Sequence, residues 1–228
     1  MIDKRSQLIA LGHKRQLTRR TGYKCIGEYH EGVYECDFVS PYSKTASNID
    51  ASLMVLLQDW ASDDKLRGSL DQDAATLGYT PSLKTNQYLI NLLNEYFGLK
   101  LHDIFATNVF PFVKLGPMNA HIPMSDLIRA AEEFALPQIE IVAPTVAACL
   151  GVSAFNALRR AIQGTKIRPV ANLEEAINSP FRIGSTQVWC QAHTGQLGRN
   201  NRNRGGVDRV KADWDQMAAA HSSALRRT

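Results

Sequence analysis

Short apolar runs alternate with helical patterns along the chain from about residue 50 onwards. The runs cover residues 52–57, 104–110, 145–150 and 186–192. Such runs are typical of strands that are buried on both faces, as in a parallel sheet. Between and after them, apolar residues recur at helical spacing. They predict helices over 85–97, from Ser125 onwards, and over 153–162, 173–177 and 207–221.

This alternation predicts the fold class. Strands separated by helices favour an α/β protein, a three-layer α/β/α sandwich with a central, mainly parallel four-stranded sheet. Residues 51–228 would form this domain and end in a basic helix. Residues 1–50 would add an N-terminal basic helix and a hairpin-like extension. Because 22–40 alternates loosely and contains Gly27 and Gly32, it predicts a hairpin or an irregular cover.

Basic residues gather at both ends of the chain. Residues 1–20 carry six Lys and Arg against one acidic residue, and residues 191–228 carry seven against three, although the net charge is only +4. The body between them is therefore acidic, and basic ends favour an anionic partner. Nucleic acid is favoured over membrane because Asn residues separate the Arg residues of 199–204 and Gly residues flank this stretch, in place of bulky apolar residues. The alternative is that the charged ends are merely solvated.

Composition narrows the class of protein further. The 228 residues are 44% hydrophobic and 21% charged, which is a globular balance, and no apolar run is long enough for a membrane helix. The four cysteines form no C-x-x-C pair and the histidines show no ligand spacing. We therefore expect no metal, no iron–sulfur cluster and no cofactor. Residues 1–20 lack the apolar stretch of a secretory signal, so we expect a reducing, cytoplasmic compartment.

Three polar side chains end or follow the expected strands. Asp59 comes directly after the first apolar run, Asn108 lies near the end of the second, and His193 follows the fourth. Because ligands bind at the carboxyl ends of the strands in open α/β sheets, we expect these side chains to converge on one crevice. Each also has a plainer interpretation, as a helix N-cap, a buried backbone cap and a surface loop residue respectively.

Four segments carry a family resemblance. They are LLQDWAS at 56–62, FATNVFPF at 105–112, PTVAACLGVSAFNAL at 144–158 and AHTGQLGRN at 192–200. In order and placement they resemble the uracil-DNA glycosylase superfamily over roughly residues 50–205. The chain departs from the family pattern at Leu57, where Gly is common, at Trp60, where Pro is common, and at 193–195, where His-Pro-Ser is usual.

The resemblance implies an enzyme, a DNA glycosylase that hydrolyses the N-glycosidic bond of a flipped-out pyrimidine and leaves an abasic site. Asp59 would stabilise the cationic sugar and orient water. His193 would donate a hydrogen bond to the departing base as a neutral imidazole. Gln58 and Asn108 would bind the base, and Tyr79 is our candidate for the aromatic side chain that stacks on it.

The segment after His193 would contact DNA. Leu197 is expected to fill the space that the extruded base vacates. Gly195 would let the loop approach the DNA backbone, and polar and basic side chains would contact phosphates. These are Arg199, Asn200, Arg202 and Arg204. A disordered basic linker is the alternative for this stretch.

One position bears on the substrate. In strict uracil enzymes of the family, a bulky Tyr two residues after the Asp excludes substituents on carbon 5 of the base, and Ala61 occupies that position here. We therefore expect uracil or a damaged or C5-modified pyrimidine, such as a modified cytosine of phage DNA, as the target, unless Trp60 fills the space. Both DNA repair and phage defence are open as roles.

Two other classes of protein remain open. One is a non-catalytic protein on the same fold that binds DNA or a modified base. The other is a different α/β hydrolase or a nucleotide-processing enzyme, which the absence of G-x-S-x-G, G-x-x-x-x-G-K-[ST] and G-x-G-x-x-G disfavours. We expect DNA as the partner, no membrane association and a monomer.

Overall fold

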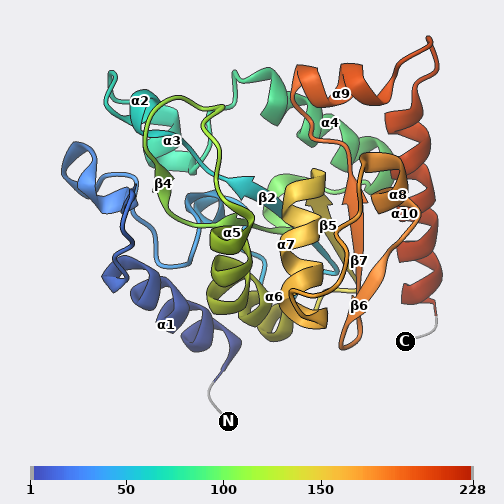
Figure 1. Cartoon of the computed structure of the whole chain (residues 1–228), viewed down its shortest axis with the longest axis horizontal. Coiled ribbons are helices and arrows are strands. Elements are labelled where there is room, and N and C mark those ends of the chain that lie inside the picture. Colours follow the sequence, from blue (N-terminus) through green and yellow to red (C-terminus); the bar gives the residue numbers. More distant parts are fainter. Residues whose placement is uncertain (1–2, 227–228) are drawn as a thin grey trace.

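A five-stranded sheet forms the centre of the computed structural model, which describes residues 3–226 (Figure 1). The strands follow the order β3–β2–β5–β7–β6. Four of them run parallel to one another: β2 (Leu53–Asp59), β3 (Phe105–Phe110), β5 (Val146–Leu150) and β7 (Thr186–Gln191). The edge strand β6 (Phe181–Ile183) pairs antiparallel with β7.

The predicted α/β sandwich with a mainly parallel sheet is confirmed. The four apolar runs form the four parallel strands, within two residues at either end. The fifth strand, β6, is absent from the sequence prediction. Within β6, Phe181 and Ile183 are buried and Arg182 between them is exposed. A strand of three residues is too short to establish a period of two that would distinguish it from a loop.

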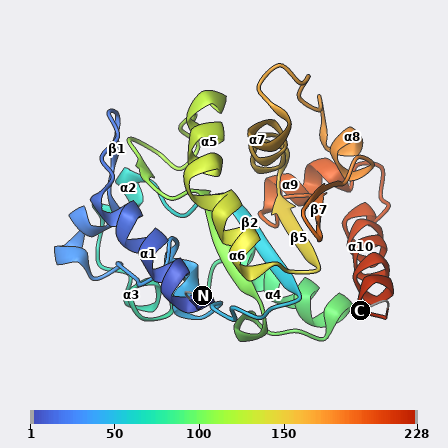
Figure 2. The same cartoon turned by 90° about the horizontal axis from the view of Figure 1, so that it is seen from below.

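Two layers of helices cover the sheet. Along β2, Met54 and Leu56 pack into one hydrophobic cluster, whereas Leu53 and Val55 pack into the other, because successive side chains of a strand point to opposite faces. The first cluster is covered by α1 (Lys4–Leu17), α5 (Met124–Ala130), α6 (Leu136–Val142) and α7 (Val152–Gln163). Of these helices, α5 and α7 lie in front of the strands in Figure 1. The second layer contains α4 (Lys84–Phe97) and α10 (Arg209–Leu225), and Figure 2 shows the same layers from below.

The helix that begins near Ser125 continues past Pro137. A π-helical segment, Ala131–Ala135, joins α5 to α6, and Pro137 lies in the first turn of α6. Proline lacks an N–H donor, and the locally widened π-helical turn accommodates that loss.

Residues 22–40 form an irregular cover rather than a hairpin of their own. The short strand β1 (Tyr23–Lys24) pairs antiparallel with β4 (Val113–Lys114), far along the chain, and short 3-10 turns follow β1. Apolar side chains of the N-terminal segment, among them Leu8 and Tyr42, are buried in the two core clusters. The N-terminal segment therefore contributes directly to the core around the sheet.

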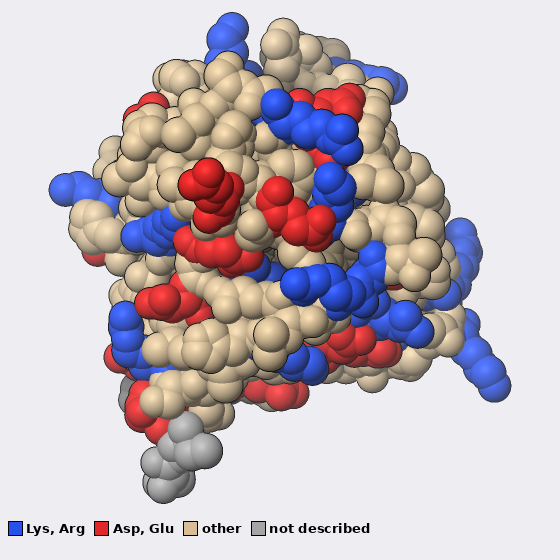
Figure 3. All heavy atoms as spheres, turned by 90° about the vertical axis from the view of Figure 1, so that its left-hand side faces the viewer, with Lys and Arg blue, Asp and Glu red and all other residues tan. Residues whose placement is uncertain are grey.

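Several basic side chains near the N-terminus are paired with acidic ones. The ion pairs are Lys4–Asp50 at 3.0 Å, Arg15–Glu35 at 2.6 Å and Arg20–Glu133 at 2.8 Å. Figure 3, which shows the left-hand side of Figure 1, displays basic and acidic side chains intermixed. Pairing therefore neutralises part of the N-terminal charge within the fold.

Short helices complete the chain. After β2 come α2 (Asp63–Leu66) and α3 (Gln72–Leu77), α8 (Leu173–Ile177) precedes β6, and α9 (Gln196–Arg202) follows β7. Across residues 3–226, no helix combines the length and the apolar character needed to cross a membrane.

Candidate active site

The carboxyl ends of three parallel strands border a cavity of about 410 Å³, which we call the main cavity. Asp59 ends β2 and His193 follows β7, and both line the main cavity together with Gln58 and Trp60. Residues 151–154, at the N-terminal end of α7, form another part of the wall. The fold therefore brings the two proposed catalytic side chains to one cavity.

Both carboxylate oxygens of Asp59 are engaged. Oδ2 lies 2.8 Å from Nζ of Lys114, and Oδ1 accepts a hydrogen bond from Nε2 of Gln58 at 3.0 Å. The side chains of Lys114 and Asp59 are only 5% and 9% exposed, so this ion pair is nearly buried although it borders the cavity. Contacts at both oxygens fix the orientation of the carboxylate.

Lys114 is a site residue that sequence reasoning missed. It lies in the two-residue strand β4, which is held by β1 on one side and by a bridge to Ser62 on the other. No recognisable motif surrounds this lysine, and its contact with Asp59 depends on the pairing of β4 with a strand near the N-terminus. Such a long-range pairing could not be inferred from local pattern.

His193 is held in one tautomer. Its Nδ1 accepts a hydrogen bond from the backbone N–H of Gly195 at 3.0 Å, which places the proton of a neutral imidazole on Nε2. His193 keeps substantial solvent exposure. Partial desolvation of its ring lowers the pKa of His193, and the charge of Asp59 opposes part of that shift. The hydrogen bond from Gly195 and the lowered pKa both favour the neutral, Nε2-protonated form of His193.

Two glycines allow the chain to turn closely around His193. A Cβ atom on Gly198 would lie 2.3 Å from the carbonyl oxygen of His193, and one on Gly195 would lie 2.9 Å from its Nδ1. Larger residues at either position would displace His193 or its loop. Gly195 therefore has a structural role, and its expected close approach to DNA remains a prediction.

Asn108 lies beside the site but does not line the main cavity. It pairs in register with Leu57, is fully buried, and accepts a hydrogen bond from the Ser40 hydroxyl at 2.6 Å through Oδ1. Within residues 3–226, its Nδ2 has no hydrogen-bond partner. Reading a base with Asn108 would require the segment around Ser40 to move, so this role stays a prediction.

The aromatic residues divide between two adjoining cavities. Tyr42 and Trp60 line the main cavity, and they also line a second cavity of about 300 Å³, the side cavity, together with Tyr79 and Ala61. Tyr42 stacks on Tyr79, with ring centroids 6.4 Å apart and planes 11° apart. Tyr42 is therefore nearer to the proposed chemistry than our candidate Tyr79. Sequence reasoning missed it because residues 1–50 matched no family motif.

The Trp60 side chain forms part of a shared wall. Its Nε1 donates a hydrogen bond to the carbonyl oxygen of Gly78 at 2.9 Å, and its ring meets that of Tyr34 edge to face. These contacts hold the indole between the two cavities and leave the side cavity open next to Ala61.

The residues expected to contact DNA lie on or next to α9. Leu197 is 75% exposed, and Asn200 and Arg204 are also exposed. The guanidinium of Arg199 lies over the ring of Tyr88, 4.2 Å from its centroid. Leu197, Asn200 and Arg204 are thus available to a partner, and their contact with DNA remains a prediction.

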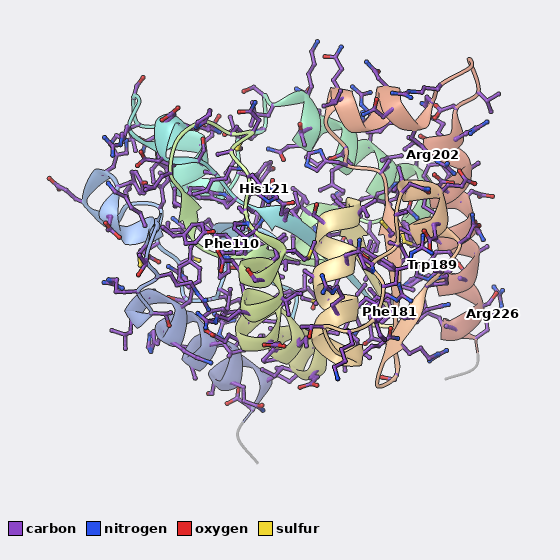
Figure 4. The ribbon with its side chains drawn as sticks, in the orientation of Figure 1. Phe110, His121, Phe181, Trp189, Arg202 and Arg226 are labelled. Atoms are coloured by element: carbon purple, nitrogen blue, oxygen red, sulfur yellow. The ribbon has the colours of Figure 1, made fainter. Side chains whose placement is uncertain are left out.

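Arg202 is held within the fold. Its guanidinium forms ion pairs with Asp213, at 2.6 Å, and with Glu174, where α9, α10 and α8 meet (Figure 4). Its side chain is only 9% exposed. Two carboxylates therefore already neutralise its charge, which favours a structural role for this residue over phosphate binding.

Metal-ligating side chains do not gather in the part of the chain that the structure describes. Across residues 3–226, no group of three or more His, Cys, Asp or Glu side chains could hold a metal ion.

Comparisons with known proteins bear on this arrangement. No match was found among curated proteins. A family model described as Uracil DNA glycosylase superfamily matches residues 66–218. This segment includes Lys114 and His193 and begins after Asp59, and it covers well over half of the chain. Together with the α/β sandwich fold, the match shows that the chain belongs to the uracil DNA glycosylase superfamily.

Proposed function

We propose that this protein is a DNA glycosylase that removes a pyrimidine, either uracil or a C5-modified base, from DNA. The observation that carries the proposal is that Asp59 and His193 line the same cavity, with His193 held as a neutral Nε2–H donor. A carboxylate and a neutral imidazole on either side of a glycosidic bond suit its hydrolysis.

The proposed reaction separates charge between the sugar and the base. As the bond between C1′ and N1 breaks, its electron pair leaves with the base, and the sugar becomes an oxocarbenium ion. The Asp59 carboxylate stabilises this cation, orients a water molecule toward C1′ and accepts a proton from it. Nε2–H of His193 donates a hydrogen bond to the oxygen on carbon 2 of the base, where negative charge develops.

Lys114 is proposed to position Asp59. Its ammonium, 2.8 Å from Oδ2, holds one carboxylate oxygen, while Gln58 holds the other. This support restrains the side chain before the substrate binds, so less orientational freedom is lost in the transition state.

Other residues would hold the extruded nucleotide. Tyr42 offers a ring at the wall of the main cavity on which a base can stack. Leu197, which is 75% exposed on α9, is suited to enter the duplex in place of the extruded base. Ala61 lines the adjoining side cavity, and this supports a base with a substituent on carbon 5.

The test is base release from synthetic DNA. Duplex and single-stranded oligonucleotides carry uracil, a thymine mismatch or a C5-modified cytosine, and abasic sites are scored by alkaline cleavage. Asp59→Asn is expected to lower the rate by roughly 10²–10⁴-fold. His193→Ala should lower it by about 10²–10³-fold.

Matched controls test whether the losses are specific. Asp215→Asn and His13→Ala change the same residue types at exposed positions and should leave the rate unchanged. Full activity in both Asp59→Asn and His193→Ala would refute the mechanism. Tight binding of a modified duplex without any base release would instead favour a non-catalytic binding protein.

A further inference from the structure

The side cavity contains chemical groups that the proposed hydrolysis does not use. It has a volume of about 300 Å³ and shares Tyr42, Trp60 and Asn86 with the main cavity. Ala61, only two residues after Asp59, lines the side cavity and is itself 3% exposed. A group attached to a base in the main cavity would therefore meet the side cavity along the wall that the two share.

Aromatic rings form a large part of this lining. The rings of Tyr34 and Trp60 meet edge to face with centroids 5.4 Å apart, and Tyr79 adds a third ring. Trp60 and Tyr79 are partly exposed. Their rings can therefore contact a ligand without any change in the core.

Polar groups lie in the same cavity. The Thr80 hydroxyl donates a hydrogen bond to Oδ2 of Asp71 at 2.5 Å, and Oδ1 of Asp71 accepts one from the backbone N–H of Ala74 at 3.0 Å. Each carboxylate oxygen has two lone pairs, so Asp71 retains acceptor capacity for a ligand. Ser69, which is exposed, adds a further hydroxyl.

A sugar ring matches this combination of groups. The carbon-bound hydrogens of a pyranose pack against aromatic rings, while its hydroxyls can donate to carboxylate oxygens. An alkyl substituent would remove the Asp71 carboxylate from water without supplying a hydrogen bond to its remaining lone pairs, which is unfavourable. The lining therefore favours a polyhydroxylated group over a methyl or longer alkyl group.

The side cavity is large enough for one sugar unit. A cavity of about 300 Å³ has room for several water molecules, and a single hexosyl group fits within the same space. A methyl or hydroxymethyl group would leave most of the cavity filled with water.

We infer that the side cavity binds a single hexose attached through carbon 5 of the target pyrimidine. This inference rests on the proposed glycosylase function and specifies its substrate class. The base occupies the main cavity beside Asp59, and the sugar lies between the aromatic rings and Asp71.

The test compares four duplexes that differ only in the target base: cytosine, 5-methylcytosine, 5-hydroxymethylcytosine and glucosylated 5-hydroxymethylcytosine. Base release and duplex binding are measured in parallel. The unmodified protein should release the glucosylated base at least about tenfold faster than the other three. Equal or faster release of a smaller base would overturn the inference and leave the glycosylase function intact.

A cavity-filling variant locates the effect. Ser69→Trp places a bulky ring at an exposed position of the side cavity that is not part of the main cavity. It should slow release of the glucosylated base by about tenfold or more, without weakening binding to a duplex with an abasic-site analogue. Ser185→Trp, at an exposed turn, is the matched control, and thermal unfolding confirms that both variants fold.

The remaining outcomes separate the two proposals. An unchanged rate in Ser69→Trp, or equal loss of binding to the abasic duplex, would show that the side cavity does not receive the sugar. Tighter binding of the glucosylated duplex without release of any base, by the unmodified protein, would retain the sugar site and refute the glycosylase function. The absence of both release and preferential binding would refute both proposals.

Discussion

Removal of Lys114 provides a quantitative test of the site. The variant Lys114→Met keeps most of the side-chain volume but leaves the Asp59 carboxylate without its cation. At the 2.8 Å separation of Nζ and Oδ2, an effective dielectric constant of about 20 corresponds to an attraction of roughly 6 kcal/mol. The desolvation of both ions offsets part of this attraction.

The expected loss of stability is smaller than the Coulomb energy. Breaking a buried ion pair by removing one partner costs about 3–5 kcal/mol. Because this pair borders the main cavity, which water can enter, we expect the lower end, about 3 kcal/mol. For a chain of this length, that corresponds to a fall in the midpoint of thermal unfolding of roughly 6–12 °C.

Urea unfolding of four proteins measures the coupling: the unmodified chain, Lys114→Met, Asp59→Asn and the double variant. The double variant has no unpaired charge at this place. The fall in its free energy of unfolding should therefore be smaller than the sum of the falls in the two single variants, by about 2 kcal/mol or more. Lys166→Met, at an exposed lysine, should change the free energy of unfolding by less than about 0.5 kcal/mol. Additive losses, or a loss below about 1 kcal/mol in Lys114→Met, would refute the assignment of a strongly coupled buried pair.

Further predictions concern His193 and its loop. Partial desolvation of its ring lowers the pKa of His193, so the acidic limb of the activity profile should have its midpoint below 6.5. A midpoint at or above 6.5 would contradict this. For the same reason the folded state binds fewer protons than the unfolded state below pH 6.5, so this group lowers stability as the pH falls, which urea unfolding at several pH values can measure. Gly198→Ala, whose Cβ would lie 2.3 Å from the carbonyl oxygen of His193, should cost about 1–3 kcal/mol of stability and lower base release, whereas unchanged unfolding and activity would show that the loop adapts freely. Leu197→Ala, at a 75% exposed position, should change the free energy of unfolding by less than about 0.5 kcal/mol. It should slow base release more from duplex than from single-stranded DNA. Equal slowing on both substrates would contradict the role of Leu197 as a wedge in the duplex.

The sequence by itself determined the parallel core and the place of the two catalytic candidates. Continuous apolar runs indicate strands buried on both faces, and parallel strands align their carboxyl ends at one edge of the sheet. Asp59 and His193 each come at or just after the end of such a run, so their convergence followed from the strands alone. Local sequence pattern was sufficient to place these two residues, because each lies at a short, fixed distance along the chain from the end of its own strand.

Only the tertiary structure decided which other side chains surround them. Lys114 reaches Asp59 because β4 pairs with β1, and Tyr42 reaches the main cavity from an irregular N-terminal segment. Asn108 is at the expected strand end, yet Ser40 packs against it and keeps it from the cavity surface. These contacts join residues far apart along the chain. Hydrophobic periodicity cannot predict them, because they depend on how the N-terminal segment and β4 pack against the sheet.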